Sequence, residues 1–159
     1  MLRLVVMGVS GCGKTTLGAA LAARLGVAFV DADDLHPPAN RAKMAAGVAL
    51  TDADRWPWLD LVAEALHNRA PVVVACSALR RAYRDRLREA GGEGVRLLHL
   101  AAPREVNPAR LAAPRGHFAA ASLLDSQNAP PEPPGPGEAL TLDARLPPDA
   151  LLAEALARL

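Results

Sequence analysis

The sequence predicts an α/β fold in which a parallel β-sheet lies between two layers of helices. Short, wholly apolar segments alternate along the chain with longer segments in which leucine and alanine recur every three or four residues. The first pattern is typical of strands that are covered on both faces, and the second of helices that bury one face. Strands that alternate with helices need crossover connections, which make neighbouring strands parallel.

Each element follows from its local pattern. Apolar residues follow one another without alternation at residues 4–7, 27–30 and 72–75, where buried strands are expected. A fourth strand is expected at residues 95–100 and a short fifth at residues 140–142. Gly26 is placed to end the first helix, and the proline-rich residues 130–137 are expected to form an extended surface loop. Helices are expected where apolar residues share one face, marked in order by Leu17, Leu21 and Leu25; Leu59, Val62, Ala63 and Leu66; Leu79, Tyr83 and Leu87; and Leu152, Ala155, Leu156 and Leu159.

The composition limits the number of domains and the kinds of partner. A chain of 159 residues with 51% hydrophobic and 22% charged residues fits a single domain, residues 1–159. Its 18 basic and 17 acidic residues nearly balance, which argues against a protein that coats nucleic acid or an anionic membrane. The apolar run at residues 4–9 is too short for a membrane span or a secretory signal. Cys12 and Cys76 lack the spacing of a disulfide framework or a metal site, so a reduced, cytoplasmic setting is expected.

A phosphate-binding motif follows the first expected strand. The segment Gly8-Val9-Ser10-Gly11-Cys12-Gly13-Lys14-Thr15 matches G-x-x-x-x-G-K-S/T in full and lies between a strand and a helix, as the motif requires. Its glycines let successive amides point into one concavity, and the helix N-terminus favours negative charge. Lys14 is expected to reach the β- and γ-phosphates of a nucleoside triphosphate, Thr15 to offer its hydroxyl to Mg²⁺, and Thr16 to belong to the same nucleotide site. The alternatives are a glycine-rich turn that contains a lysine by chance and, for Cys12, a reactive thiol.

The other strand ends narrow the kind of triphosphate-binding protein. A guanine-reading Asn-Lys-x-Asp segment is missing, because both lysines lie early in the sequence. The third strand runs into Ser77 rather than into the aspartate that is typical of motor ATPases. Asp31 and Asp33 instead follow the second strand, and alternation along an extended segment puts both carboxylates on one side, at the strand end where α/β sheets bind ligands. One carboxylate can hold the metal shell and the other can take a proton from an acceptor hydroxyl; the alternative is an acidic turn in which Asp34 caps the next helix.

These residues resemble those of the gluconokinase family of small P-loop kinases. After the phosphate loop, the matching segments are Asp31-Ala32-Asp33-Asp34-Leu35-His36-Pro37, Asn40, Lys43-Met44, Gly47, Leu50-Thr51-Asp52-Ala53-Asp54-Arg55-Trp56-Pro57-Trp58-Leu59, Ala75-Cys76-Ser77-Ala78-Leu79, Tyr83-Arg84-Asp85, Gly116-His117-Phe118 and Ser126-Gln127. The Leu-His-Pro and Asp-Arg-x-Pro-Trp segments separate this family from shikimate and adenylate kinases. The resemblance implies a P-loop kinase three-layer sandwich with helices on both faces of a five-stranded parallel sheet in the order 2-3-1-4-5, and a homodimer.

The resemblance also implies an activity, the transfer of the γ-phosphoryl group of ATP to the 6-hydroxyl of D-gluconate. In this interpretation Lys14 stabilises charge on the transferring phosphoryl group, and Thr15 and Asp31 hold Mg²⁺. Asp33 orients or deprotonates the acceptor hydroxyl. Two alternatives stay open: another small-metabolite kinase of the shikimate kinase type, and a nucleotide-binding module with impaired turnover.

The acid group of such a substrate requires a cation. Gluconate is a polyol with one carboxylate, and arginine is suited to bidentate contact with a carboxylate. The candidates are Arg55, Lys43, Arg81 and Arg84. Arg55 is favoured because the related shikimate kinases have an arginine there, whereas the alternative for Arg81 and Arg84 is a solvated surface charge.

Other polar residues complete the expected substrate site, namely Asp33, His36, Ser77 and His117. His36 is expected to contact the substrate or a turn rather than a metal, because no second histidine or cysteine is spaced to assist it. Trp56 and Trp58 flank Pro57, and packing in the core is favoured for them over contact with a sugar.

A lid-like segment, residues 107–131, departs from the family pattern. The resemblance implies that Arg110 precedes the lid and stacks on adenine, and that the lid brings Arg115 to the transferring phosphate, with Gly116 and His117 beside it. Pro108 and Pro114 interrupt the helix that the family has here. Residues 107–131 are therefore expected to be poorly ordered or unusually folded, which puts the reach of Arg115 in question.

Overall fold

The computed structural model contains a five-stranded sheet in the order β2-β3-β1-β4-β5, and it describes residues 1–9, 11–102 and 132–159. All strand pairings are parallel. The strands are β1 Arg3–Met7, β2 Ala28–Asp31, β3 Val72–Ala75, β4 Val95–Ala101 and β5 Leu140–Asp143. The predicted fold class and strand order are confirmed, and the strands lie at the expected places.

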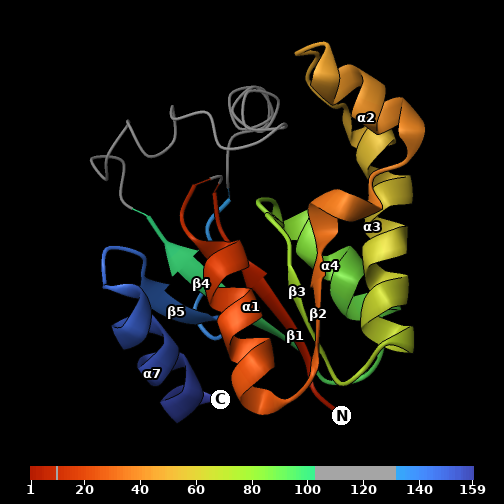
Figure 1. Ribbon diagram of the computed structural model, residues 1–159. Coiled ribbons are helices and arrows are strands. Elements are labelled where there is room, and N and C mark those ends of the chain that lie inside the picture. The colour runs from red at the N-terminus through yellow and green to blue at the C-terminus, as the bar shows by residue number, and fades with distance from the viewer. Residues whose placement is uncertain (10, 103–131) are drawn as a thin grey trace.

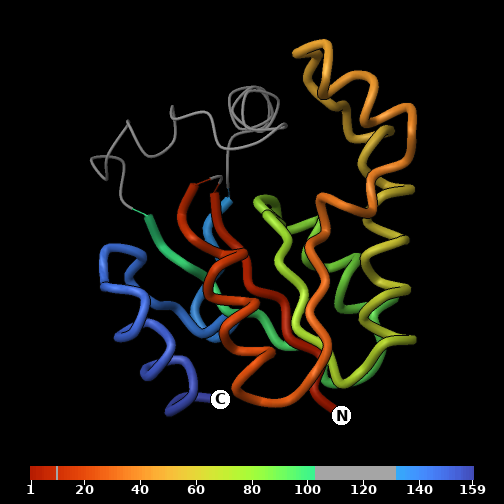
Figure 2. The backbone as a smooth tube through the Cα atoms, in the orientation of Figure 1, coloured from red at the N-terminus to blue at the C-terminus, as the bar shows by residue number. Residues whose placement is uncertain are grey.

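Helices cover both faces of the sheet (Figures 1 and 2). They are α1 Lys14–Leu25, the 3₁₀ helix η1 Ala32–Leu35, α2 Pro38–Ala45, α3 Asp52–Asn68, α4 Arg81–Ala90 and α7 Pro148–Arg158. Helices α1 and α7 pack on one face, and α3 and α4 on the other. The side chains of β1 alternate between the layers, since Leu4 and Val6 pack with the apolar residues of α1 and α7, and Val5 and Met7 with those of α3 and α4.

The carboxyl ends of the parallel strands meet at one edge of the sheet, the upper edge in Figure 1. There the chain leaves β1 for the phosphate loop, β2 for η1, and β3 for residues 76–80. Helix α2 and the start of α3 extend beyond this edge. Ligands of open α/β sheets bind at this position, so the fold brings the predicted site residues toward one region.

Several helix ends differ from the predicted positions. Gly26, with φ +67°, ends α1 as predicted, but Leu25 beside it is 41% exposed rather than part of the buried face. Leu79 precedes α4, which begins at Arg81. Helix α2 was not predicted from its polar sequence, and it buries only Asn40 and Met44.

Two further predictions concern packing and loops. Trp58 is 4% exposed and belongs to the core, and Trp56 packs against that core, so core packing is confirmed for both. Of the expected surface loop 130–137, the described residues 132–137 form neither helix nor strand and are exposed or half-buried. The lid-like segment 107–131, with Arg110, Arg115, Gly116 and His117, lies outside the described residues, as does Ser10. Among the helices of the described ranges, none is both long and apolar enough to span a bilayer.

Candidate active site

The phosphate loop has the backbone shape that its motif predicts. Gly11 and Gly13 have φ of +81° and +98°, a region that favours glycine. The N–H of Cys12 donates to the carbonyl of Val9 at 3.2 Å, which closes the loop into a turn directly before α1. The loop therefore ends at the positive end of a helix dipole, where an anion is stabilised by backbone N–H groups.

Gly8 occupies a position that has no room for a side chain. A Cβ atom there would lie 2.6 Å from Cys12 Sγ and 2.9 Å from the carbonyl oxygen of Leu100. The N–H of Gly8 donates to the carbonyl of Ser77 at 3.3 Å, which ties the loop to the segment after β3. Cys12 is only 3% exposed, and burial of this kind is typical of an inert rather than a reactive thiol.

Thr15 and Asp31 lie together beside the loop. Thr15 Oγ1 donates to Asp31 Oδ2 at 3.3 Å. Thr15 belongs to the first turn of α1 and Asp31 is the last residue of β2, so a helix and a strand each supply one oxygen. Within residues 1–9, 11–102 and 132–159, no group of three or more His, Cys, Asp and Glu side chains could hold a metal. A cation at Thr15 and Asp31 would therefore draw further ligands from phosphate or water.

Asp33 does not lie on an extension of β2, as strand alternation predicted. The chain turns at Asp31 into η1, where Asp31 Oδ1 accepts a hydrogen bond from the N–H of Asp33 at 3.0 Å. Asp31, rather than Asp34, therefore provides the side-chain cap in this acidic turn. Asp33 still lies near Cys76, the residue after β3. Burial raises the pKa of the Cys76 thiol to about 12, and the nearby carboxylates of Asp33 and Asp31 add to this rise. Lys14 acts on the same thiol in the opposite sense, so all three charged groups lie near the end of β3.

Aromatic stacking holds η1 against α3. The rings of Trp58 and His36 stack with centroids 4.3 Å apart, and Trp58 Nε1 donates to the carbonyl of Ala32 at 2.7 Å. Asn40 Nδ2 lies 3.2 Å from His36 Nδ1, which accepts from it when the ring proton is on Nε2. Burial, and to a lesser extent the nearby Arg41 and Arg55 guanidinium groups, lower the pKa of His36 to about 4, so the ring is neutral at pH 7. His36 is thus a turn contact, one of the two roles expected for it.

Arg55 lies at a polar pocket beside the start of α3. The residue is 5% exposed, and its Nη1 donates to Tyr83 Oη at 3.0 Å and to Asp52 Oδ1 at 3.3 Å. The Tyr83 hydroxyl donates to the same oxygen of Asp52, so three groups hold one another in place. The pocket has a volume of about 590 Å³ and is lined by Val48, Ala49, Leu50, Thr51, Asp52, Arg55 and Arg80. A guanidinium fixed at such a pocket can bind the carboxylate of a small polar acid.

Lys43 and Arg81 lie outside the lining of this pocket. Lys43 Nζ is 2.6 Å from Asp54 Oδ2, and this ion pair joins α2 to the first turn of α3. The side chain of Arg81 is 67% exposed and lies 3.9 Å from Asp85 one turn later on α4. Lys43 still lies close to the pocket, because its carbonyl accepts from the N–H of Val48 at 2.8 Å.

Arg84 lies neither at the substrate pocket nor at the solvated surface, the two environments that the sequence suggested. Its side chain is 1% exposed, its Nε donates to Glu138 Oε2 at 2.7 Å, and its Nη1 donates to the carbonyl of Ala78 at 3.0 Å. Burial alone would raise the pKa of Glu138, but hydrogen bonds, first among them that from Arg84, lower it to about 2. This buried ion pair fixes the segment that carries Ser77, and Arg84 is neither a solvated charge nor a part of the candidate substrate pocket.

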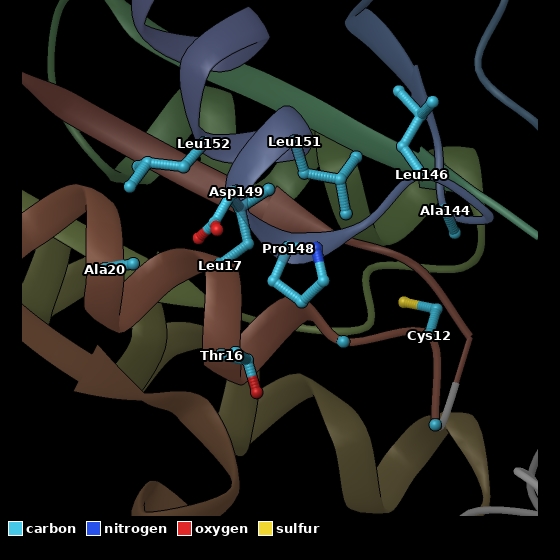
Figure 3. A pocket seen from close by; sticks show the side chains of 12 residues that line it. Cys12, Thr16, Leu17, Ala20, Ala144, Leu146, Pro148, Asp149, Leu151 and Leu152 are labelled. Carbon is cyan, nitrogen blue, oxygen red and sulfur yellow. The ribbon is translucent and has the colours of Figure 1, made fainter.

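A second pocket lies beside the phosphate loop, between α1 and α7 (Figure 3). Its volume is about 320 Å³. Figure 3 shows Cys12 and Thr16 on the side of the loop, with Leu146, Pro148 and Leu151 on the side of α7. Largely apolar walls next to loop amides suit the base of a nucleotide whose phosphates occupy the loop. The sequence predicted Thr16 at this site but gave no signal for the residues after β5.

Sequence reasoning missed three residues at the Arg55 pocket: Asp52, Arg80 and Tyr83. A signal for Asp52 was present, because Thr51 and Asp54 form a capping box that fixes the start of α3 and hence puts Asp52 and Arg55 on adjacent turns of one face. Arg80 carried no such signal, since it is one of two consecutive arginines and no capping motif in the sequence distinguishes which of them begins the helix.

The strand order, the glycine-rich loop between β1 and α1, and the adjoining Thr15–Asp31 oxygens define the class of the small P-loop kinases. The protein-family model described as "AAA domain" matches residues 4–133. A gluconokinase of Gluconobacter oxydans (strain 621H) is 45% identical over 158 residues, which cover 95% of this chain and 87% of the relative. The chain therefore belongs to the gluconokinase family, and residues 4–133 carry its AAA domain.

Solved structures agree with this assignment. A gluconokinase from Sinorhizobium meliloti 1021 is 44% identical with a TM-score of 0.84, covering 98% of this chain and 90% of that chain. A sugar kinase from Janibacter sp. HTCC2649 is 47% identical with a TM-score of 0.85, covering 99% and 94%. A shikimate kinase from Aquifex aeolicus is only 16% identical, with a TM-score of 0.55 over 99% and 95% of the two chains, and it shares the fold alone.

Proposed function

We propose that the protein transfers the γ-phosphoryl group of ATP to the 6-hydroxyl of D-gluconate, forming 6-phospho-D-gluconate and ADP. The observation that carries the proposal is the presence, at one edge of the sheet, of a phosphate loop, the Thr15–Asp31 oxygen pair and a pocket that contains Arg55. Relatives named gluconokinase support the choice of substrate. The likeness to shikimate kinase concerns the fold and gives that alternative no comparable support.

ATP occupies the loop and the adjoining apolar pocket in this proposal. The amides before α1 bind the phosphate oxygens, and Lys14, the first residue of α1, stabilises charge on the transferring group. The adenine base lies in the pocket between α1 and α7, of which Thr16 is a lining residue. Rigid donors that are set before the reaction cost no reorganisation when charge develops.

Mg²⁺ is the ion that the oxygens of Thr15 and Asp31 fit. One hydroxyl and one carboxylate oxygen 3.3 Å apart form an all-oxygen donor set, and Mg²⁺ is commonly held by one or two protein groups together with substrate phosphates and water. When held by Thr15 and Asp31, the ion would supply positive charge that offsets the negative charge of the phosphate group. Asp31 is itself fixed by the N–H of Asp33, so its carboxylate is oriented before ligands arrive.

Asp33 is the group that we assign to the acceptor hydroxyl. It follows Asp31 on η1, and η1 is packed on α3, the helix that carries Arg55. A carboxylate near the acceptor can orient the hydroxyl and take its proton as the O–P bond forms. Arg55 then holds the opposite, acidic end of the substrate, so that the molecule is bound in one direction.

Replacement of Asp33 by Asn tests the assignment. The kcat with gluconate should fall by about two to four orders of magnitude, while the Kd of ATP, measured by calorimetry, stays within about twofold. Asp34→Asn, at the exposed neighbouring residue, is the matched control and should keep the wild-type rate. ADP release should be measured with gluconate, shikimate and other sugar acids. Wild-type protein that binds ATP but forms no acceptor-dependent ADP would indicate the nucleotide-binding module instead.

The cellular location and the oligomeric state of the protein are part of the same proposal. A cytoplasmic location is supported by Cys12 and Cys76, which are both buried free thiols. A homodimer is supported by the family resemblance alone, and sedimentation or light scattering would test it.

A further inference from the structure

We infer that Arg80 is a second binding residue for the substrate carboxylate and acts together with Arg55. The inference rests on the proposed function, and it adds a residue that the sequence analysis did not single out. Two of the seven residues that line the 590 Å³ pocket are arginines, and they come from different parts of the chain. Arg55 lies on α3, and Arg80 directly precedes α4.

Arg55 forms the rigid side of the pair. Its guanidinium lies 5.5 Å from the centre of the Tyr83 ring and shares the Asp52 carboxylate with the Tyr83 hydroxyl. Tyr83 itself is held in a low-dielectric environment, since burial and then Asp52 raise its pKa to about 12. A guanidinium ordered in this way loses little entropy when it binds an anion.

Arg80 forms the adjustable side. Its main chain is fixed, because its carbonyl accepts from the N–H groups of Tyr83 and Arg84 at 3.1 and 3.2 Å, as the cap of α4. Its side chain is 34% exposed, and Nε lies 3.5 Å from Glu132 Oε1. An ion pair this long between two partly exposed groups is weak, so a carboxylate that enters the pocket can compete for the guanidinium.

The segment that carries Arg80 is anchored on three sides. The carbonyls of Ser77, Ala78 and Leu79 accept, in that order, from the N–H of Gly8, from Arg84 Nη1 and from the N–H of Glu132. The same segment therefore contacts the phosphate loop at one end and supplies Arg80 to the pocket at the other. Two guanidinium groups from separate, anchored elements can hold a carboxylate in one orientation through charge-assisted hydrogen bonds.

The experiment compares acidic and neutral acceptors. Steady-state kinetics are measured for wild type, Arg80→Met and Arg80→Lys, with gluconate and ATP varied in turn, and with D-glucitol as the hexitol that lacks the carboxylate. Arg86→Met is the matched control, because Arg86 is a partly exposed arginine of α4 that pairs with Asp60 and does not line the pocket. Thermal unfolding of each variant shows that the compared proteins are folded.

For Arg80→Met we expect the KM of gluconate to rise about tenfold or more, with the KM of ATP within about twofold. Arg80→Lys should recover part of the loss, and activity with D-glucitol should be unaffected by either variant. An unchanged KM for gluconate in both variants, or an equal loss with D-glucitol, would overturn the role of Arg80 while leaving gluconate phosphorylation intact. Absence of gluconate-dependent ADP formation by the wild type would overturn the proposed function, and the role of Arg80 with it.

Discussion

His36 should make the stability of the protein depend on pH between about 4 and 6.5. The imidazole is 7% exposed, stacked on Trp58 and hydrogen bonded to Asn40. Burial is the largest cause that lowers its pKa from 6.5 to about 4. In this pH range the unfolded chain binds a proton that the folded chain does not, so the free energy of unfolding falls as the pH falls.

The size of the effect follows from the two pKa values. Protonation of the unfolded state alone between pH 7 and pH 5 lowers the free energy of unfolding by about 2 kcal/mol when the folded pKa is about 4. His36→Gln removes the titrating group, so the variant should lose about 2 kcal/mol less than the wild type over the same interval. The variant is less stable at pH 7, because it loses the ring stack, but the change with pH is independent of that loss.

Urea denaturation at pH 7 and pH 5 measures this difference. His67→Gln is the matched control, because it replaces an exposed histidine at the end of α3, outside the stack of His36 on Trp58. The other groups that titrate over this interval are common to all three proteins and cancel in the comparison. If His36→Gln lost as much stability as the wild type on acidification, the assignment of a neutral, buried His36 would be wrong.

Two further predictions concern the phosphate loop and the buried ion pair. Gly8→Ala should weaken ATP binding about tenfold or more in calorimetry, because the added Cβ would lie 2.9 Å from the fixed carbonyl oxygen of Leu100. Gly135→Ala is the control, because a Cβ atom there has no neighbour within 4 Å. Equal affinities of the two variants for ATP would contradict the steric argument. Glu138→Gln should lower the free energy of unfolding by about 3 kcal/mol, because Arg84 stays buried without its counter-charge. Asp143→Asn, in a partly exposed pair, should lower the free energy of unfolding far less than Glu138→Gln, and similar losses in the two variants would argue against the importance of burial.

Much of the architecture could be predicted because it depends on local pattern. Apolar runs without alternation placed β1, β2 and β3, and segments rich in leucine and valine placed β4 and β5. The glycine and lysine spacing of the phosphate loop placed its turn and the start of α1. The position of Asp33 could not be predicted in this way, because the period-two alternation of side chains holds only while the chain stays extended. The side chain of Asp31 accepts from the N–H of Asp33 and turns the chain into η1, and such a local side-chain cap competes with strand continuation in a way that composition does not reveal.

The arginines around the start of α4 show a second limit of sequence reasoning. Arg80, Arg81 and Arg84 are chemically identical, and their roles depend on the residue at which the helix begins. Helix α4 begins at Arg81, so Arg80 is the extended residue before the helix, and it lines the pocket. The side chain of Arg81 is largely exposed, whereas that of Arg84 pairs with the buried Glu138. A one-residue shift of the sequence along this helix would rotate each side chain by about 100° and change these environments. The substrate cation could therefore be predicted at Arg55, where a capping box fixes the helix start, and not at α4, whose first turn has no side-chain hydrogen bond from its N-cap residue.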